Sequence, residues 1–455
     1  MGLIAFGLGF TACNTNDDDM PEIEKGEKAR VSIRVAVNSQ GTRIVGDVLD
    51  SELLALESAV NALEVWIFNA TTGVLEAHKR VATTDAKVYE KDALQDDDPL
   101  QQFGNSLVLN DITVPAGDKQ LVMAANTNIG GVVSSTRLSD FKKTLSAAAS
   151  QEIDDGMVMT SLIKPITLEG GMQHMFGTPP AGHHHPTVPF TQLSPGGDPL
   201  FLSRINARVA LAELTFEFKK FDDPDYPEYV GKTGVMLFDG SFVEFDRFVL
   251  TDVVVLNAPE KSKLFAAGAE RLFNQDKFIY GMNLPPFGGD QFKTDILDES
   301  FAAQPISLVD VADNANLTEI GESISAILLD RKEGDVPYFY LLENESVAGE
   351  RTMLVIRGKL FNGAEHIDDK ILSDNVCDNG FTYYTIFIGA PYGLLEGGNT
   401  TPGLVFDNTV YRNTQYNYFV TLTGPGYNKV GDETAKLDVL CEVEPWKVAD
   451  QVIRF

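Results

Sequence analysis

Short apolar runs that end in turn-forming residues dominate this sequence, and they limit the folds that the chain can adopt. Typical examples from the second half are "GVMLFDG", "VPYFYLLENES" and "YNYFVTLTGPGYN". Runs of about five to eight residues, bounded by Gly, Pro, Asn and Asp, are typical of strands in β-sandwiches. No repeat of fixed period recurs along the sequence, which argues against a propeller or a solenoid. The sequence therefore predicts an all-β fold with minor helices.

The length of the chain and a change of composition predict two domains. A chain of 455 residues is longer than one ordinary domain. Residues 174–199 are rich in Pro, Gly and His, have no period and contain too many breakers to form an element. We place the boundary at the end of this passage, with one β-sandwich domain over residues 31–199 and another over residues 200–455. Residues 14–30 are expected to be a solvated tether.

Helical spacing of apolar residues occurs in two places. It predicts helices at residues 49–64 and 137–150, with Ser139 or Asp140 as the N-cap of the second. Directly after the Pro/Gly/His-rich passage, residues 201–220 alternate over most of their length. They are predicted to form a long strand with one apolar face.

The first residues form an apolar run that ends at a cysteine. In "MGLIAFGLGFTAC", small residues stand just before Cys13, and a polar, acidic stretch follows. Residues 1–13 are thus similar to a bacterial lipoprotein signal, in which the thiol is acylated and becomes the new N-terminus. No Lys or Arg precedes the run, and the alternative is that Cys13 is incidental. A bilayer span takes ~20 apolar residues, and no run after Met20 is that long.

Charge and cysteine content exclude several classes of partner and scaffold. The formal net charge of −30 argues against a nucleic acid partner, because a phosphate backbone needs a cationic face. It also argues against electrostatic docking on anionic lipid and is typical of a soluble, self-repelling surface. Three cysteines are too few for a disulfide scaffold in this chain. We interpret Cys377 and Cys441 as buried free thiols, with a disulfide between them as the alternative.

No motif in the sequence carries recognisable catalytic or cofactor chemistry. The chain lacks a GxSxG elbow, a Walker loop, HExxH, CxxC and EF-hand spacing. The triple histidine at residues 183–185, with His174 nearby, is the one metal-like cluster, but a Pro/Gly loop supplies no groups that hold ligands in place. Trp66 and Trp446 are expected to fill cores. We therefore expect no catalytic residue, no cofactor, no dedicated metal site and no enzyme; a glycan hydrolase has no motif behind it.

The stretch "VSIRVAVNSQGTRIVGD", residues 31–47, joins a strand pattern to an exposed arginine. In its first half, one face carries the apolar side chains of Val31, Ile33, Val35 and Val37. The polar run that follows ends in Arg43, and mobile polar loops are preferred sites of proteolysis. Arg30 and Arg34 suit a protease less, because one is expected to precede the strand and the other lies within it. By itself, the pattern also fits an ordinary first strand.

The C-terminal residues, about 437–455, show a second strand-like alternation. It runs through Leu437, Val439, Cys441 and Val443. Past Pro445, one parity carries Trp446, Val448 and Val452, with Asp450 interrupting it. This tail fits either an ordinary last strand or a segment that inserts into another molecule.

Several segments, taken in their order and spacing, resemble one known family. They are "ARVSIRVAVNSQGTRIVG", "LVMAANTN", "INARVALAEL", "PYFYLLENES", "LVIRGKL", "YNYFVTLTGPG" and "KLDVLCEVEPWKV". Over roughly residues 29–455, the chain resembles the major fimbrial subunits (fimbrillins, type V pilins) of the Bacteroidales. The resemblance implies two transthyretin-like β-sandwich domains and no catalytic site.

The resemblance also implies a life cycle. A family member is exported as a lipoprotein precursor, acylated at Cys13, and reaches the outer membrane. An arginine-specific protease then cuts between Arg43 and Ile44 and so removes the first strand. The emptied groove accepts an extended segment of another subunit, a role that we assign to the C-terminal tail.

The expected function is therefore a structural subunit of a cell-surface fimbria, which polymerises with itself and joins minor fimbrial subunits. The alternative is a binding module: a fimbrial tip or accessory subunit, or a surface lipoprotein adhesin. A stalk subunit needs both an excisable first strand and a donor tail, and this sequence carries both patterns.

Overall fold

The structure is a computed structural model of the whole chain, and strands dominate the residues that it describes. These residues are 27–37, 57, 59–82, 87–88, 100–103, 106–127, 129, 133–143, 145–147, 156–178, 190–216, 218–237, 239–259, 261–265, 278–280, 326–327, 338–344, 351–363, 365–367, 381–390, 393–394, 409–427 and 437–445. None of their helices has the length and apolar character that crossing a bilayer requires. The predicted all-β fold class with minor helices is confirmed.

The N-terminal domain is built on one sheet of 12 strands, which runs in the order β3-β2-β7-β9-β13-β1-β6-β5-β4 with β10, β11 and β12 attached beside this path. Its strands are β1 (Lys28–Val37), β2 (Ala62–Asn69), β3 (Leu75–Ala82), β4 (Lys87–Val88), β5 (Leu100–Phe103), β6 (Ser106–Pro115), β7 (Gly117–Ala125), β9 (Met159–Thr160), β10 (Lys164–Leu168), β11 (Gln173–Phe176), β12 (Phe190–Gln192) and β13 (Leu200–Arg204). The sheet folds over on itself, so that side chains of β1 and β6 share one buried core with those of β2 and β7.

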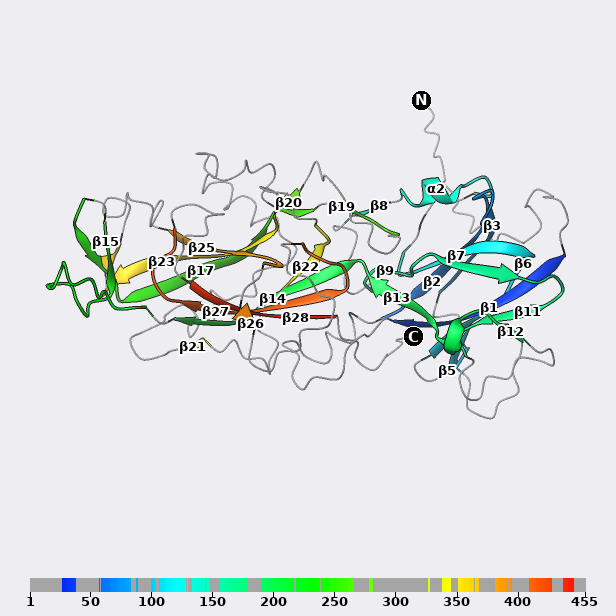
Figure 1. Cartoon of the computed structure of the whole chain (residues 1–455), viewed down its shortest axis with the longest axis horizontal. Coiled ribbons are helices and arrows are strands. Elements are labelled where there is room, and N and C mark those ends of the chain that lie inside the picture. The colour runs from blue at the N-terminus through cyan, green and yellow to red at the C-terminus, as the bar shows by residue number, and fades with distance from the viewer. Residues whose placement is uncertain are drawn as a thin grey trace, which may run out of the picture.

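The C-terminal domain stacks two sheets over a second core. One sheet contains β14 (Asn206–Phe216), β21 (Ala326–Ile327), β22 (Tyr338–Leu342), β26 (Gly393–Leu394), β27 (Thr414–Leu422) and β28 (Leu437–Pro445). The other contains β17 (Arg247–Leu256), β23 (Met353–Asn362), β24 (Glu365–His366) and β25 (Thr382–Phe387). Buried residues of both sheets form the core between them. Figure 1 shows the two domains at opposite ends of an elongated molecule.

The described residues also form three two-stranded pairs. They are β15 (Gly234–Met236) with β16 (Phe242–Glu244), β18 (Ala258–Pro259) with β20 (Phe278–Tyr280), and β8 (Leu145–Ala147) with β19 (Lys261–Lys263). The last pair joins a strand from the N-terminal half of the chain to one from the C-terminal half.

The two predicted helices are not formed as expected. The helix predicted at 137–150 is reduced to α2 (Leu138–Phe141), whose N-cap is Arg137 without a side-chain capping bond. The chain then enters β8, because pairing with β19 overrides the local helical spacing. The helix predicted at 49–64 is wrong at its end, where β2 begins at Ala62 and pairs on both sides. Glu57 is helical, and the rest of that segment lies outside the described residues.

A single residue, Ile205, separates the domains along the chain. β13 ends at Arg204 in the N-terminal sheet, and β14 begins at Asn206 in the C-terminal one. The long strand predicted within 201–220 is therefore two strands, since successive residues pair with different sheets. Ile205 is fully buried, in keeping with its place at the domain junction.

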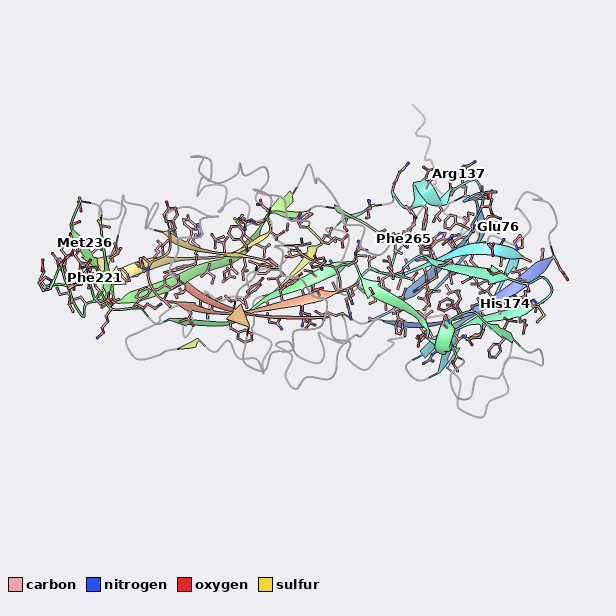
Figure 2. All side chains as sticks on the ribbon, viewed as in Figure 1. Glu76, Arg137, His174, Phe221, Met236 and Phe265 are labelled. Atoms are coloured by element: carbon pink, nitrogen blue, oxygen red, sulfur yellow. The ribbon has the colours of Figure 1, made fainter. Side chains whose placement is uncertain are left out.

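Aromatic side chains from both halves of the chain fill the junction. Trp66, expected to fill a core, is fully buried and lies 4.8 Å from Phe141 and 5.6 Å from Phe265 between ring centroids. Phe141 and Phe265 stack at 4.6 Å. Phe265 follows β19, and Figure 2 shows it between the two domains. Trp446 lies outside the described residues.

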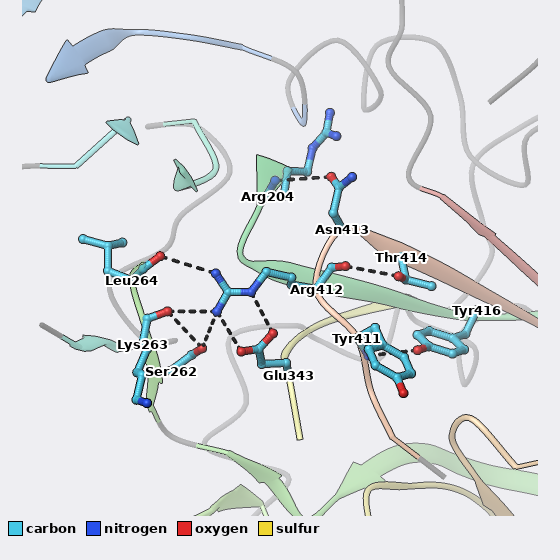
Figure 3. Close-up of polar contacts among 10 residues, drawn as sticks. All are labelled: Arg204, Ser262, Lys263, Leu264, Glu343, Tyr411, Arg412, Asn413, Thr414 and Tyr416. Carbon is cyan, nitrogen blue, oxygen red and sulfur yellow. Dashed lines mark hydrogen bonds and ion pairs between the residues drawn. The ribbon is translucent and has the colours of Figure 1, made fainter. Parts of the chain in front are cut away.

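A charged cluster of the C-terminal half lies at the junction, as Figure 3 shows. Arg412 Nε and Nη2 each donate to the carboxylate of Glu343 at 2.7 Å, and Nη2 donates to the carbonyl of Lys263 at 2.9 Å. Two parallel bonds from one guanidinium to one carboxylate fix the orientation of both side chains. Next to this pair, the backbone N–H of Arg204 donates to Asn413 Oδ1 at 3.2 Å. Polar and apolar contacts together hold the domains in one arrangement.

Candidate functional site

The first strand occupies an interior position in the N-terminal sheet. On one side, β1 pairs antiparallel with β6 from Lys28 to Val35. On the other side, its first half pairs parallel with β11 and its second half with β13. Both backbone edges of β1 are therefore hydrogen-bonded, which distinguishes it from a strand added at the rim of a sheet.

One face of β1 is a continuous part of the core. Ala29, Val31, Ile33 and Val35 are at most 2% exposed. They lie in the same buried cluster as side chains of β6 and β13, among them Leu107, Leu109, Leu200 and Leu202. Burying a side chain of the size of Val or Ile contributes about 1.5–3 kcal/mol. The strand predicted at Val31–Val37 thus forms, and it starts earlier than predicted, at Lys28. It fills a gap between β6 and the strands β11 and β13, which we call the slot and which is lined with aliphatic side chains.

Local backbone features shape both sides of this slot. On the β6 side, the register shifts between Val31 and Ile33, and Asp111 has a positive φ of 52°. The Asp111 N–H donates to Ser32 Oγ at 3.3 Å, so β1 supplies a partner at the bulge. On the other side, Gly177 has φ +90° and a Cβ there would lie 2.9 Å from the Cβ of Arg34. Only glycine fits this approach between the ends of β11 and β13.

The structure places Arg30 and Arg34, the two arginines that suit a protease less than Arg43, within the strand. Arg30 was expected to precede the strand, but it lies inside β1, opposite Thr113 of β6 and Gln173 of β11. Arg34 also lies in β1, and its Nη1 donates to the carbonyl of Thr178 at 3.2 Å. Strand pairing removes both peptide bonds from easy access to a protease. Arg43 and Ile44, the predicted cleavage position, lie outside the described residues, as does Cys13.

The residue that anchors the chain after the predicted cleavage position is Glu57. Its buried carboxylate accepts hydrogen bonds from Arg208 Nη1 at 2.8 and 2.9 Å and from the Tyr340 hydroxyl at 2.8 Å. Its carbonyl accepts one from Arg204 Nε at 2.9 Å. Removal of one partner from a buried pair of this kind costs about 3–5 kcal/mol. Glu57 thus fixes the chain to the domain junction five residues ahead of β2.

Burial also affects the pKa of Arg204. Desolvation lowers the pKa of its guanidinium to about 10, an effect that the charge of Glu57 partly offsets and that of Arg208 reinforces. The side chain remains a cation at neutral pH. Two buried arginines therefore lie near the carboxylate of Glu57, whose negative charge offsets theirs.

The predicted donor tail is partly inside the C-terminal sheet. β28 pairs antiparallel with all of β27, from Leu437 opposite Leu422 to Pro445 opposite Thr414. Thr414 follows the Arg412–Asn413 turn at the junction, so β28 ends on the side that faces the N-terminal domain. The predicted inserting residues Trp446, Val448 and Val452 lie outside the described residues.

The histidine and cysteine candidates give no assembled site among the described residues. His174 is buried in β11, where its Nε2 lies 3.0 Å from the backbone nitrogen of Glu169. Within the described ranges, no three His, Cys, Asp or Glu side chains gather as metal ligands would. Residues 183–185 and Cys377 lie outside those ranges, and Cys441 is a residue of β28.

The sequence pattern missed the neighbours of β1. β11 and β12 lie in the passage predicted to be an irregular loop, because strands of three or four residues with polar side chains leave no readable alternation. The role of Glu57 was also missed, since its partners Arg204, Arg208 and Tyr340 are distant in sequence. The one available signal was a pair of arginines inside an otherwise apolar strand pattern, which implies a buried counter-charge.

Comparison with known proteins assigns the chain to a family. The family model for the major fimbrial subunit protein (FimA) matches residues 29–204, and that for the FimA4 pilin C-terminal domain matches residues 242–446. Among curated proteins, the major fimbrium subunits FimA type-4 (strain ATCC BAA-308 / W83) and FimA type-2 of Porphyromonas gingivalis are each 24% identical to this chain. Each alignment covers 99% of this chain and 97% of the relative.

Solved structures show the same fold. A fimbrilin from Porphyromonas gingivalis W83 superposes with a TM-score of 0.56 at 21% identity, covering 94% of this chain and 99% of that one. A putative cell adhesion protein from Parabacteroides distasonis ATCC 8503 superposes with a TM-score of 0.54 at 15% identity and the same coverage. With both domains matched by fimbrial models, this chain belongs to the major fimbrial subunit (fimbrillin) family of the Bacteroidales and is a structural subunit of a cell-surface fimbria.

Proposed function

We propose that the subunit is made as a lipidated precursor, is cut after Arg43, and polymerises when a neighbour's tail replaces β1. The observation that carries this proposal is the place of β1 in the sheet. β1 pairs on both edges and fills the core, yet one segment, residues 38–61, joins it to all later strands. A single cut in that segment separates β1 covalently from the rest of the sheet.

Loss of β1 creates a site that only another strand fills well. It exposes the aliphatic lining contributed by β6 and β13 and leaves unpaired backbone groups on both sides of the slot. Exposed strand edges of this kind pair readily with a further chain. An extended segment that adds as a strand satisfies the backbone groups through main-chain hydrogen bonds and fills the core with alternate side chains.

The anchoring of Glu57 supports a cut at Arg43 in particular. Glu57 lies thirteen residues after Ile44, and its bonds to Arg204 and Arg208 do not involve β1. The new N-terminal segment would therefore stay attached at the domain junction when β1 leaves. It would not follow β1 out of the sheet or unravel β2.

At least as many residues follow β28 as β1 contains, which is enough for the donor role. Residues 446–455 after β28 number ten, as do the residues of β1. An extended strand rises about 3.3 Å per residue, so the two segments have the same reach. β28 itself pairs along its whole length with β27 and provides a firm base for a donor tail.

The precursor would be held at the outer membrane by acyl chains on Cys13 until an arginine-specific protease releases it. Single acyl chains bind membranes reversibly, and stable anchoring takes two signals, which a diacylated cysteine provides. The partners of the mature subunit are other copies of this chain and minor fimbrial subunits.

Ile33→Ala should weaken the hold of β1 in the precursor. It removes fully buried aliphatic volume, and such changes cost about 2–5 kcal/mol. Urea unfolding of the full chain measures this loss, and chromatography after cleavage should show faster release of the β1 fragment. Arg30→Ala, on the exposed face of the same strand, is the matched control. Equal stability and equal release for the two variants would contradict the role of the buried face.

Arg43→Ala should leave the precursor folded, uncut and monomeric. The substitution removes the protease's recognition side chain and leaves the sequence of β1 unchanged. Arg34→Ala, within the paired strand, should still be cut. N-terminal sequencing of surface material and a polymer ladder on a gel provide the readout. A ladder of unchanged strength from the Arg43 variant would rule out cleavage at this position.

Deletion of residues 446–455 should abolish polymerisation and leave the melting temperature of the subunit within a few degrees. The deletion begins after the last residue that pairs in β28. Electron microscopy of cleaved subunits decides the outcome. Fibres formed by the truncated chain would mean that another segment is the donor.

Cys13→Ser should prevent acylation and reduce delivery to the cell surface, because the hydroxyl does not replace the acylated thiol. Metabolic labelling with a fatty acid measures the modification directly. Cys441→Ser should keep the label. Fatty-acid label that persists in the Cys13 variant would show that the acyl chains are attached to another residue, which contradicts acylation at Cys13.

A further inference from the structure

A lysine, a glutamate and an asparagine meet in the N-terminal sheet, on strands other than β1. Lys119 Nζ of β7 lies 2.7 Å from Glu76 Oε2 of β3. The Asn69 side-chain amide, at the end of β2, donates from Nδ2 to Glu76 Oε1 at 3.0 Å. One carboxylate therefore bridges an amine and a carboxamide. Figure 2 shows Glu76 in the N-terminal domain, and the assembly function described above uses none of these three groups.

Strand register explains why the three side chains meet. β2 and β7 pair antiparallel with Asn69 directly opposite Lys119, so their side chains share one face of the sheet. β2 and β3 shift register between Ile67 and Phe68, which leaves Glu76 as the extra residue of a bulge. Bulges re-aim side chains and are over-represented beside reactive sites.

The burial of the pair is unusual for a stabilising contact. Lys119 is 1% exposed and Glu76 is 6% exposed. Lysine is almost never fully buried, and a buried ion pair is often no more stable than apolar residues of similar size. The Lys119 ammonium also donates to the carbonyl of Ala116 at 3.0 Å, which holds Nζ in place. Water is excluded from an amine and a carboxylate that stand within proton-transfer distance.

The amide of Asn69 is polarised by the backbone. Its Oδ1 accepts hydrogen bonds from the N–H groups of Thr71 at 3.0 Å and Thr72 at 2.9 Å. Two backbone donors on one oxygen identify that atom as the carbonyl and direct Nδ2 toward Glu76. Two N–H donors on one carbonyl oxygen also stabilise the negative charge that develops on this oxygen when a nucleophile attacks the carbonyl carbon. The turn at Asn69 thus makes its Cγ an electrophile.

We propose that Lys119 and Asn69 form an intramolecular isopeptide bond, with Glu76 as the proton-transfer catalyst. Glu76 takes a proton from the Lys119 ammonium, and the neutral amine attacks Asn69 Cγ while negative charge develops on Oδ1. The Nζ–Cγ bond forms and the Cγ–Nδ2 bond breaks. Lys119 gives up two protons in all, Nδ2 receives them through Glu76, and it leaves as ammonium. Glu76 returns to a carboxylate, and no oxidant or cofactor is needed.

The bond would join β2 and β7 covalently, at neighbouring positions on adjacent strands. It would close the chain from residue 69 to residue 119 into a ring, which restricts the unfolded state in the way that other cross-links do. A fimbrial subunit meets proteases outside the cell, and such a link would make its N-terminal domain more resistant to unfolding and to proteolysis.

Intact-mass measurement of the folded full chain tests the proposal. The wild type should be lighter than its sequence mass by one ammonia molecule, and a protease digest should contain a branched peptide that links Lys119 to Asn69. Asn69→Ala, Lys119→Arg and Glu76→Gln should each show the full mass and no branched peptide. Lys79→Arg, a lysine on β3 whose Nζ donates to the Asn110 carbonyl, is the matched control and should keep the loss.

Two results would overturn the proposal. One is a folded wild type that keeps its full mass after prolonged incubation. The other is loss of ammonia without a branched peptide, which indicates ordinary cyclisation at an asparagine. If Glu76→Gln fails to fold, Asn69→Ala still decides the question, because it keeps the Lys119–Glu76 ion pair and removes the electrophile, together with the two turn hydrogen bonds from Thr71 and Thr72.

Discussion

Backbone pairing of β1 with β6 on one edge and with β11 and β13 on the other is the interaction on which the N-terminal domain depends. In the described strand order, β6, β5 and β4 are hydrogen-bonded as strands to the rest of the sheet only through β1, although β6 continues through Ala116 into β7. The same strand contributes a row of fully buried side chains to the core. A strand in this position cannot be lost without replacement, because its absence divides the sheet and exposes apolar groups on both sides of the gap.

This requirement links the fold to the function of a fimbrial subunit. A polymer joined through a shared strand gains the cohesion of a domain interior at each joint, where an ordinary surface contact would offer much less. In the exchange that we propose, the strand that would be replaced is separate from the residues that would hold the domains together. The bonds of Glu57 to Arg204, Arg208 and Tyr340 involve no residue of β1, and the contacts of Arg412, Phe265 and β19 keep the two domains in one arrangement. Exchange at one strand therefore need not disturb the junction.

The sequence predicted those elements whose stabilising pattern lies within their own residues and does not depend on distant partners. Alternation marked β1, since this strand has a buried face and a long enough run. It failed where partners distant in sequence decide the structure. The residues of β8 have helical spacing but pair with β19, and the QHMF segment of β11 is a strand because β1 lies beside it. The role of Glu57 could not be predicted for the same reason, because it depends on bonds to Arg204 and Arg208, which are distant in sequence.

The single-residue link at Ile205 has a mechanical consequence. β13 lies beside β1, and beyond Ile205 the chain continues as β14, which pairs with β27, which in turn pairs with β28. In a fibre assembled by strand replacement, tension from one joint to the next runs along this series of strands and crosses between neighbours by shear. Shear loads many backbone hydrogen bonds at once, whereas peeling breaks them one at a time. The shortness of the link leaves no slack to extend before the sheets themselves carry the force.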